Sequence, residues 1–174
     1  MMTVPHPVRR VTAAALLLVF TMSIPLAAVD SDKAAYVGGT HAAYANAKDP
    51  IEGNLNTRLD DSLVLSPLER DYSGQELRIP YRSIIDLEYG QKAGRRVGTA
   101  VATSVLLGPI GLVSLFSKKR KHYLTIGYRD DAGKDQVAVI ELGKDIVRTT
   151  LAIVETRSGK KIEYQDEEAR KSSR

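Results

Sequence analysis

Apolar and polar residues alternate along two stretches of the chain, and a long apolar run separates them. From residue 77 to residue 89 the four charged residues fall on even positions, and six apolar residues fall on odd positions. Those apolar residues are Leu77, Ile79, Tyr81, Ile85, Leu87 and Tyr89. The second stretch, His122–Arg129, repeats the alternation. A period of two puts one face of a strand on a core and the other in water. We therefore predict strands in both stretches and expect them to pair.

Shorter signals extend this β pattern on both sides. Alternation over 51–59 and the apolar run that starts at Leu63 each end at turn residues, which predicts two further strands. Pro80 has no backbone N–H, so it marks an edge, a bulge or a break between two strands. Residues 130–134 predict a hairpin turn with Gly133 at positive φ, and 136–142 form the returning strand.

One amphipathic helix is expected after the last hairpin. Its apolar residues recur at helical spacing from Ile146 to Val154. Asp145 is placed to cap its start, and Gly159 is placed to end it.

The segment 92–121 interrupts the β pattern. Residues 97–116 contain no charged side chain, a length that meets the requirement of about 20 residues for a membrane-crossing helix. Gly108 precedes a proline in its middle, which breaks a helix into two halves that are each too short to cross alone. The small residues Gly94, Gly98, Ala102, Gly108 and Gly111 predict a helix-packing stripe of the kind that allows close approach in membranes. Basic residues flank both ends, and we expect them to contact anionic headgroups: Arg95, Arg96, Lys118, Lys119, Arg120 and Lys121.

Three interpretations of this segment remain open. In the first, an apolar helical hairpin lies on or dips into a membrane and returns both ends to one side. In the second, 97–116 spans the bilayer as a kinked helix, which would put the flanking strands on opposite sides. In the third, the hairpin covers the β-domain and never meets lipid.

The distribution of charge favours a membrane surface over nucleic acid. The chain carries a net charge of +4. Without residues 1–28 and 92–121, the remainder holds 16 basic and 21 acidic residues. The excess of positive charge therefore belongs to the ends of the apolar run, as in membrane proteins. Nucleic-acid-binding proteins more often spread Lys and Arg over a face.

The N-terminal residues predict export. Two arginines precede an uncharged apolar run over 11–24, and small residues follow it up to Ala28. This order is typical of a secretory signal peptide, and we place the cleavage near Ala28. The alternative is an uncleaved anchor. The chain contains no cysteine, so neither disulfides nor lipidation of a thiol contributes.

These elements predict one α+β domain. We expect a small antiparallel β-barrel or bent sheet, similar to a pleckstrin-homology domain, with a helix capping it and the helical hairpin inserted between two strands. The expected divisions are a signal peptide at 1–28, a poorly structured lead-in at 29–50, the domain at 51–164 with its insert at 92–121, and a charged tail at 165–174.

The residues give little support to catalysis. No Gly-x-Ser-x-Gly motif is present, and 130–141 lacks the ligands of a calcium loop. A hydrolase would need His122 beside an acid such as Asp86 or Glu88. We therefore expect a protein that is not an enzyme and has no cofactor and no metal.

Several segments together resemble a group of small exported bacterial proteins of uncharacterised function. They are 78–81, 87–96, 117–126, 141–145 and 159–165. The order of strands and helix is also similar to pleckstrin-homology and GRAM-like domains, a resemblance that implies binding of lipid headgroups or peptides.

The expected function is an exported binding or scaffolding module of the cell envelope, attached to a membrane by the glycine-rich insert. Expected partners are membrane lipid or a membrane protein, with a homo-oligomer through the insert as a further option, and no nucleic acid. The alternatives are a soluble periplasmic ligand- or peptide-binding domain with the hairpin as a lid, and a bitopic protein spanning the membrane at 97–116.

Overall fold

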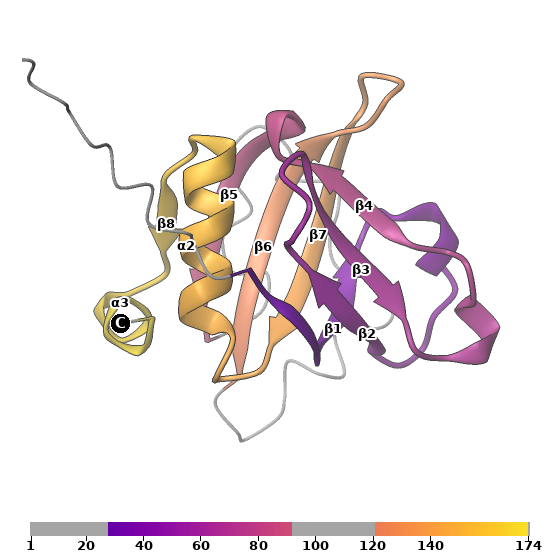
Figure 1. The fold of residues 1–174 in the computed structure, drawn as a ribbon, viewed down its shortest axis with the longest axis horizontal. Coiled ribbons are helices and arrows are strands. Elements are labelled where there is room, and N and C mark those ends of the chain that lie inside the picture. Colours follow the sequence, from indigo (N-terminus) through magenta and orange to yellow (C-terminus); the bar gives the residue numbers. More distant parts are fainter. Residues whose placement is uncertain (1–27, 92–120, 174) are drawn as a thin grey trace, which may run out of the picture.

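Eight strands form one mixed sheet in a computed structural model that describes residues 28–91 and 121–173. The strands are β1 (Asp30–Gly39), β2 (Ile51–Asn56), β3 (Ser62–Pro67), β4 (Leu77–Pro80), β5 (Ile84–Gly90), β6 (His122–Arg129), β7 (Asp135–Leu142) and β8 (Ile162–Tyr164). Their order across the sheet is β4-β3-β2-β1-β7-β6-β5-β8 (Figure 1). All neighbours are antiparallel except β8, which pairs with β5 in parallel.

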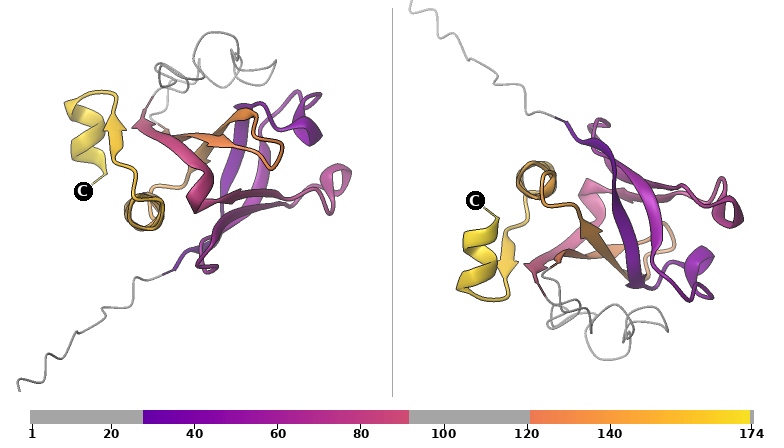
Figure 2. Two further views of the ribbon diagram at one scale, coloured as in Figure 1. Left: turned by 90° about the horizontal axis from the view of Figure 1, so that it is seen from above. Right: turned by 90° about the horizontal axis from the view of Figure 1, so that it is seen from below.

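The sheet is bent, and α2 (Val147–Ser158) lies inside the bend. Figure 2 shows α2 end-on between the side formed by β5 and β8 and the side formed by β1 to β4. The shorter helical elements are α3 (Glu167–Ser172) and three 3-10 turns, η1 (Ala42–Tyr44), η2 (Arg70–Tyr72) and η3 (Tyr81–Ser83). The helix α2 contacts η3, and α3 lies beside β8.

The core lies between the inner face of the sheet and α2. Strand residues such as Leu124 and Ile140 are fully buried there against Leu151 and Val154 of α2. Tyrosines fill the ends of this core: Tyr36 contacts Tyr44 edge-on, with 5.0 Å between ring centroids. Burial of apolar area contributes about 25 cal/mol per Å², so this single core supplies most of the stability.

Several predictions from the alternating pattern are confirmed. The strands on either side of the apolar segment pair with each other, from Ile84 opposite Tyr128 to Gly90 opposite Tyr123. The turn at 130–134 joins β6 to β7, with Gly133 at a φ of 78°. Gly159 ends α2 at a φ of 69°, and its N–H donates to the Glu155 carbonyl at 3.0 Å. Pro80 marks a break between two strands, where β4 gives way to η3.

The predicted fold class is wrong, because the sheet neither closes into a barrel nor is wholly antiparallel. After Pro80 the chain turns through η3, and β4 and β5 do not pair. The free edge of β5 pairs with β8 instead, so β4 and β8 form the two edges of an open, mixed sheet. Within 28–91 and 121–173 the α-helices are α2 and α3, neither of them part of an inserted hairpin. The predicted hairpin falls on 92–120, which lies outside the described residues.

Four local predictions also need correction. The expected lead-in at 29–50 contains β1, which lies between β2 and β7. Part of the expected tail forms α3, whose start Asp166 caps by accepting from Ala169 N–H at 2.8 Å. Asp145 does not cap α2; its carboxylate pairs with Lys33 Nζ at 2.6 Å. Finally, a register shift after η3 buries Ile84 in place of Ile85.

Gly39, at the end of β1, provides a test of the position of β1 between β2 and β7. Its φ is 136°, and a Cβ there would lie 2.1 Å from the carbonyl oxygen of Val137 in β7. Gly159 also has a positive φ but has open space around it. We expect Gly159→Ala to cost about 1–2 kcal/mol from backbone strain alone. Gly39→Ala should cost clearly more, because the backbone of β7 must also move.

Urea unfolding of both variants beside the wild type measures this difference. Equal losses of unfolding free energy in the two variants would contradict the tight approach of β1 to β7.

Candidate functional site

The two ends of the β5–β6 pair have different chemistry. At one end, Gly90 lies opposite Tyr123, so the chain leaves β5 and re-enters β6 at adjacent positions. The segment 92–120 connects these positions. At the other end, η3 precedes β5 and the β6–β7 turn follows β6. With about 3.3 Å per residue, the six steps from Ile84 to Gly90 separate the two ends by about 20 Å.

Most of the predicted site residues lie in 92–120 and therefore outside the described residues. These are Arg95, Arg96, Lys118, Lys119 and Arg120 of the basic flanks and Gly94, Gly98, Ala102, Gly108 and Gly111 of the small-residue stripe. Lys121 is described, and its Nζ lies 2.8 Å from Glu141 Oε2. Both side chains are partly buried, at 31% and 23% exposure, so Lys121 already has a carboxylate partner within the protein.

His122 belongs to a small polar cluster at this end of the pair. Its Nδ1 lies 2.5 Å from Tyr89 Oη, which is 3.3 Å from Ser172 Oγ of α3. Burial lowers the pKa of His122, and Lys144 adds to this effect while Glu141 opposes it. The neutral form of the His122 ring is therefore favoured. The contact between Tyr89 and Ser172 holds α3 close to β5.

The two acids that a hydrolase would need beside His122 do not lie next to it. Asp86 accepts a hydrogen bond from Gly127 N–H at 3.1 Å. Gly127 follows His122 by five residues in β6, which corresponds to a separation of about 16 Å along the strand. Glu88 lies opposite Thr125, on the other face of the sheet from His122, and accepts from Gln165 Nε2 at 2.8 Å. These residues thus do not assemble an acid–histidine pair.

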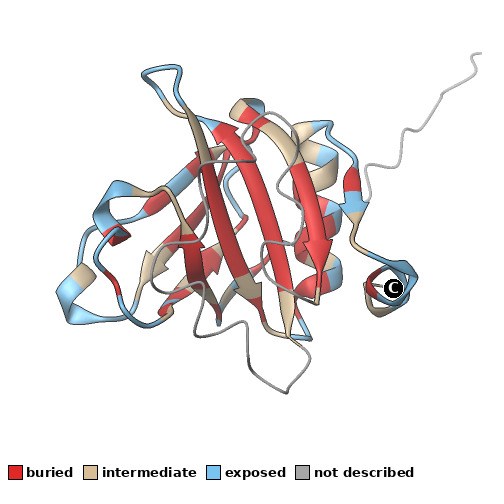
Figure 3. Ribbon diagram, turned by 180° about the vertical axis from the view of Figure 1, so that it is seen from behind, coloured by how far each residue is buried: buried red, intermediate tan, exposed pale blue. Residues whose placement is uncertain are grey.

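The outer face of the sheet carries a second set of buried apolar residues. Tyr123 alternates with the core residue Leu124, and Val137 and Val139 alternate with core residues of β7. These three side chains are at most 3% exposed, although α2 lies on the opposite face (Figure 3). Burial, assisted by Glu141, raises the pKa of Tyr123 to about 12. No element among 28–91 and 121–173 covers this face in Figure 3.

At the η3 end the open sheet leaves a depression of about 540 Å³. Its charged lining residues come from separate parts of the chain: Arg82 from η3, Arg129 from the end of β6, Asp130 and Asp131 from the β6–β7 turn, and Lys160 from the link between α2 and β8. A smaller hollow of about 260 Å³ adjoins it, shares Arg82, and is lined by Tyr81 and Arg157.

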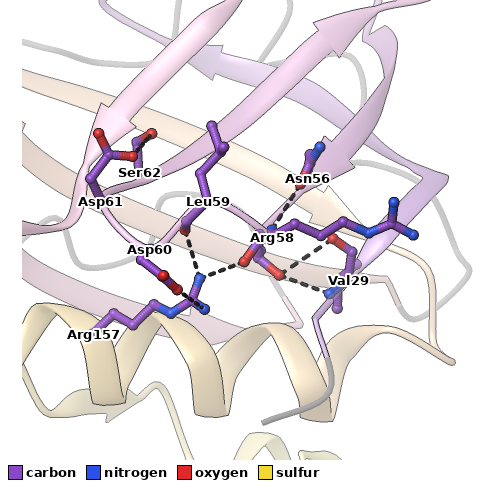
Figure 4. A network of polar contacts seen from close by, with 9 residues as sticks. Val29, Asn56, Arg58, Leu59, Asp60, Asp61, Ser62 and Arg157 are labelled. Carbon is purple, nitrogen blue, oxygen red and sulfur yellow. Dashed lines mark hydrogen bonds and ion pairs between the residues drawn. The ribbon is translucent and has the colours of Figure 1, made fainter. Parts of the chain in front are cut away.

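Arg157 holds the wall of the smaller hollow together. Its guanidinium donates to the carbonyl oxygens of Thr57 and Leu59, the latter at 2.7 Å, and pairs with Asp60 at 2.9 Å (Figure 4). It also lies over the ring of Tyr81, 5.5 Å from the centroid. One side chain of α2 thus joins the β2–β3 loop to η3, across the place where the sheet is open.

Tyr81 is buried beneath Arg157, and its hydroxyl makes no hydrogen bond within the described part of the chain. Burial raises the pKa of Tyr81, while the adjacent Arg157 lowers it. Tyr81 therefore fills space and supports the guanidinium.

The sequence did not predict the depression and the smaller hollow at the η3 end. The alternation over 77–89 places Arg82 only on the polar face of a strand, and no pattern in the sequence distinguishes Arg157 or Lys160. The useful signals were the break at Pro80 and the helix end at Gly159, because a basic residue lies within two positions of each.

The described residues contain no group of three or more His, Cys, Asp or Glu side chains placed to hold a metal ion. Across 28–91 and 121–173, no helix combines the length and the apolar character needed to cross a membrane.

Removing the donors of Arg157 should destabilise the protein. Arg157→Met keeps much of the packing over Tyr81 but leaves the Thr57 carbonyl, in a fully buried residue, without its donor. We expect a loss of about 1–3 kcal/mol in unfolding free energy, measured by urea denaturation. The matched control is Asp60→Asn. Asp60 is 95% exposed, so its loss should cost at most about 1 kcal/mol. Equal effects would show that the surface ion pair, not the carbonyl contacts, holds the loop.

The stability should also depend on pH through His122. Because its pKa is lower in the folded protein, the unfolded chain binds more protons. This contribution is fully present above the unfolded pKa of about 6.5 and is lost as the pH falls through the folded pKa. The pKa of His41 is also lowered by burial, so wild type alone does not isolate His122. The stability advantage of wild type over His122→Asn should shrink between about pH 8 and pH 5. An advantage that is constant or grows on acidification would contradict this assignment.

Comparisons with known proteins do not assign this chain to a family. No family model matches the chain, and no curated protein matches it. The resemblance to small exported bacterial proteins therefore stays a prediction.

Proposed function

We propose that this protein is an exported, non-enzymatic binding or scaffolding module of the cell envelope, attached to a membrane through residues 97–116. The observation that carries the proposal is the pairing of Gly90 with Tyr123. It fixes both attachment points of an uncharged 20-residue run at one end of one sheet. In this proposal, the segment presents its apolar residues and its basic flanks on the side of the domain where both attachment points lie.

The basic flanks support a membrane partner with an anionic surface. Five of the six predicted contact residues, Arg95, Arg96, Lys118, Lys119 and Arg120, lie within 30 positions of one another and on both sides of the apolar run. Each basic residue near such a surface contributes about 1 kcal/mol. The sixth, Lys121, contributes less in this proposal because Glu141 already neutralises it.

The same pairing argues against a bitopic protein. A single crossing at 97–116 would put β5 and β6 on opposite sides of the bilayer. Six register pairs join these two strands, so an odd number of crossings would require this ladder to be absent. Export through the N-terminal segment, with cleavage near Ala28, is part of the proposal.

One observation favours a second candidate, a soluble exported ligand- or peptide-binding domain. Val137, Val139 and Tyr123 form an apolar outer face that starts at the end where 92–120 connects. In this candidate the apolar run meets the protein's own sheet instead of lipid. The two candidates differ in whether the protein stays with membranes.

Fractionation of cells that export the full chain separates the two candidates. Under the membrane proposal, wild type should sediment with membranes and resist a high-salt wash, because salt screens charge but not apolar contact. Replacing 97–116 by a glycine–serine segment of equal length should release it. Replacing the five flanking basic residues by glutamine should weaken the association without abolishing it. Wild type that never sediments would overturn the membrane proposal and favour the second candidate.

A further inference from the structure

The depression at the η3 end offers unpaired cations. Arg82 and Lys160 are exposed, and neither side chain makes an ion pair or hydrogen bond to a residue that the structure describes. Arg129 donates from Nε to Asp135 Oδ1 at 3.1 Å, and its two terminal nitrogens make no hydrogen bond within the same part of the chain. Three basic side chains from different elements therefore present free donors to one depression.

Asp130, one of the two acids that line the depression, is already committed to the β6–β7 turn. Asp130 Oδ1 accepts from the N–H groups of Ala132 and Lys134 at 3.0 and 2.8 Å, and Oδ2 accepts from Gln136 Nε2 at 2.7 Å. These hydrogen bonds, the one from Lys134 first, lower the pKa of Asp130. Its carboxylate is thus turned toward the turn. Asp131, at the exposed tip, is the other acid of the lining.

We propose that this depression binds a small soluble ligand through an oxyanion, a phosphate or carboxylate group held by Arg82, Arg129 and Lys160. Guanidinium groups match such oxyanions with paired, charge-assisted hydrogen bonds, and lysine adds a point charge. The volume of about 540 Å³ lies in the range of small-molecule sites. The half-buried Ile85 and Pro80 supply an apolar floor for the rest of the ligand.

The position of the depression argues for a soluble source of the oxyanion over a lipid headgroup. It lies about 20 Å from the end of β5 where 92–120 connects. If that end faces a membrane, as in the proposed function, the depression faces away from the same surface. The choice of a soluble ligand over a lipid headgroup rests on the proposed membrane attachment. The oxyanion site itself does not.

The test uses the purified full chain at constant ionic strength, titrated with inorganic phosphate and, separately, with acetate. Binding is followed by the amide NMR shifts of residues that line the depression. We expect saturable shifts there for wild type, tighter with phosphate than with acetate. The variant Arg82→Gln/Lys160→Gln should weaken phosphate binding at least tenfold. A control that also removes two exposed cations, Lys48→Gln/Arg148→Gln, should change it less than twofold.

Several outcomes would overturn the proposal. Shifts that never saturate, or equal weakening in both double variants, would reduce the effect to general charge. A parallel arm measures binding to vesicles that contain anionic phospholipid. If Arg82→Gln/Lys160→Gln loses vesicle binding while phosphate fails to saturate wild type, the oxyanion is a headgroup and the soluble source is wrong. The phosphate arm contains no lipid, so its result stands whether or not the protein sediments with membranes.

Discussion

The antiparallel ladder between β5 and β6 is the constraint on which the rest of this protein depends. Six register pairs close a connection of about 30 residues, and closure of a loop that long costs about 3 kcal/mol beyond a constant. The ladder recovers this cost because both strands also bury Leu87, Leu124 and Ile126 in the common core. Because this cost grows only with the logarithm of loop length, doubling the connection would add only about 0.6 kcal/mol.

The absence of pairing between β4 and β5 is the second constraint on the structure. Because β4 and β5 do not pair, the place between them needs another closure, which α2 and Arg157 provide. Hydrogen bonds from one guanidinium to two loop carbonyls tie the helix to the β2–β3 loop. The same opening leaves room for the depression lined by Arg82 and Lys160. A closed barrel would have filled this room with strand pairing, so the departure from the expected fold is what makes a surface site available there.

Periodicity predicted most individual strands and the pairing of β5 with β6 and of β6 with β7, but not the open sheet that the strands form together. The alternation over 77–89 and over His122–Arg129 reflects burial of one face, and burial is a property that a sequence records directly. The strand β1 escaped prediction because its Ala and Gly residues gain stability from neighbours on both sides, which no local pattern encodes. The open sheet was missed because the choice of β8 over β4 as partner of β5 depends on the direction of the chain after η3. The cations of the depression were missed for a similar reason, since three distant segments bring them together.

The two ends of the β5–β6 pair divide the chemistry of the molecule. Tyr123, on the apolar outer face, lies at the end where residues 92–120 connect, and every charged residue of that segment is basic. Adjacent to Ile84, free cations and turn-bound Asp130 surround a depression that no described side chain fills. The ladder of about 20 Å between them is longer than the screening length of about 8–10 Å, so charges at one end are largely screened from the other through water. The two proposals, membrane attachment at one end and oxyanion binding at the other, therefore concern separate parts of the sheet and can be tested independently.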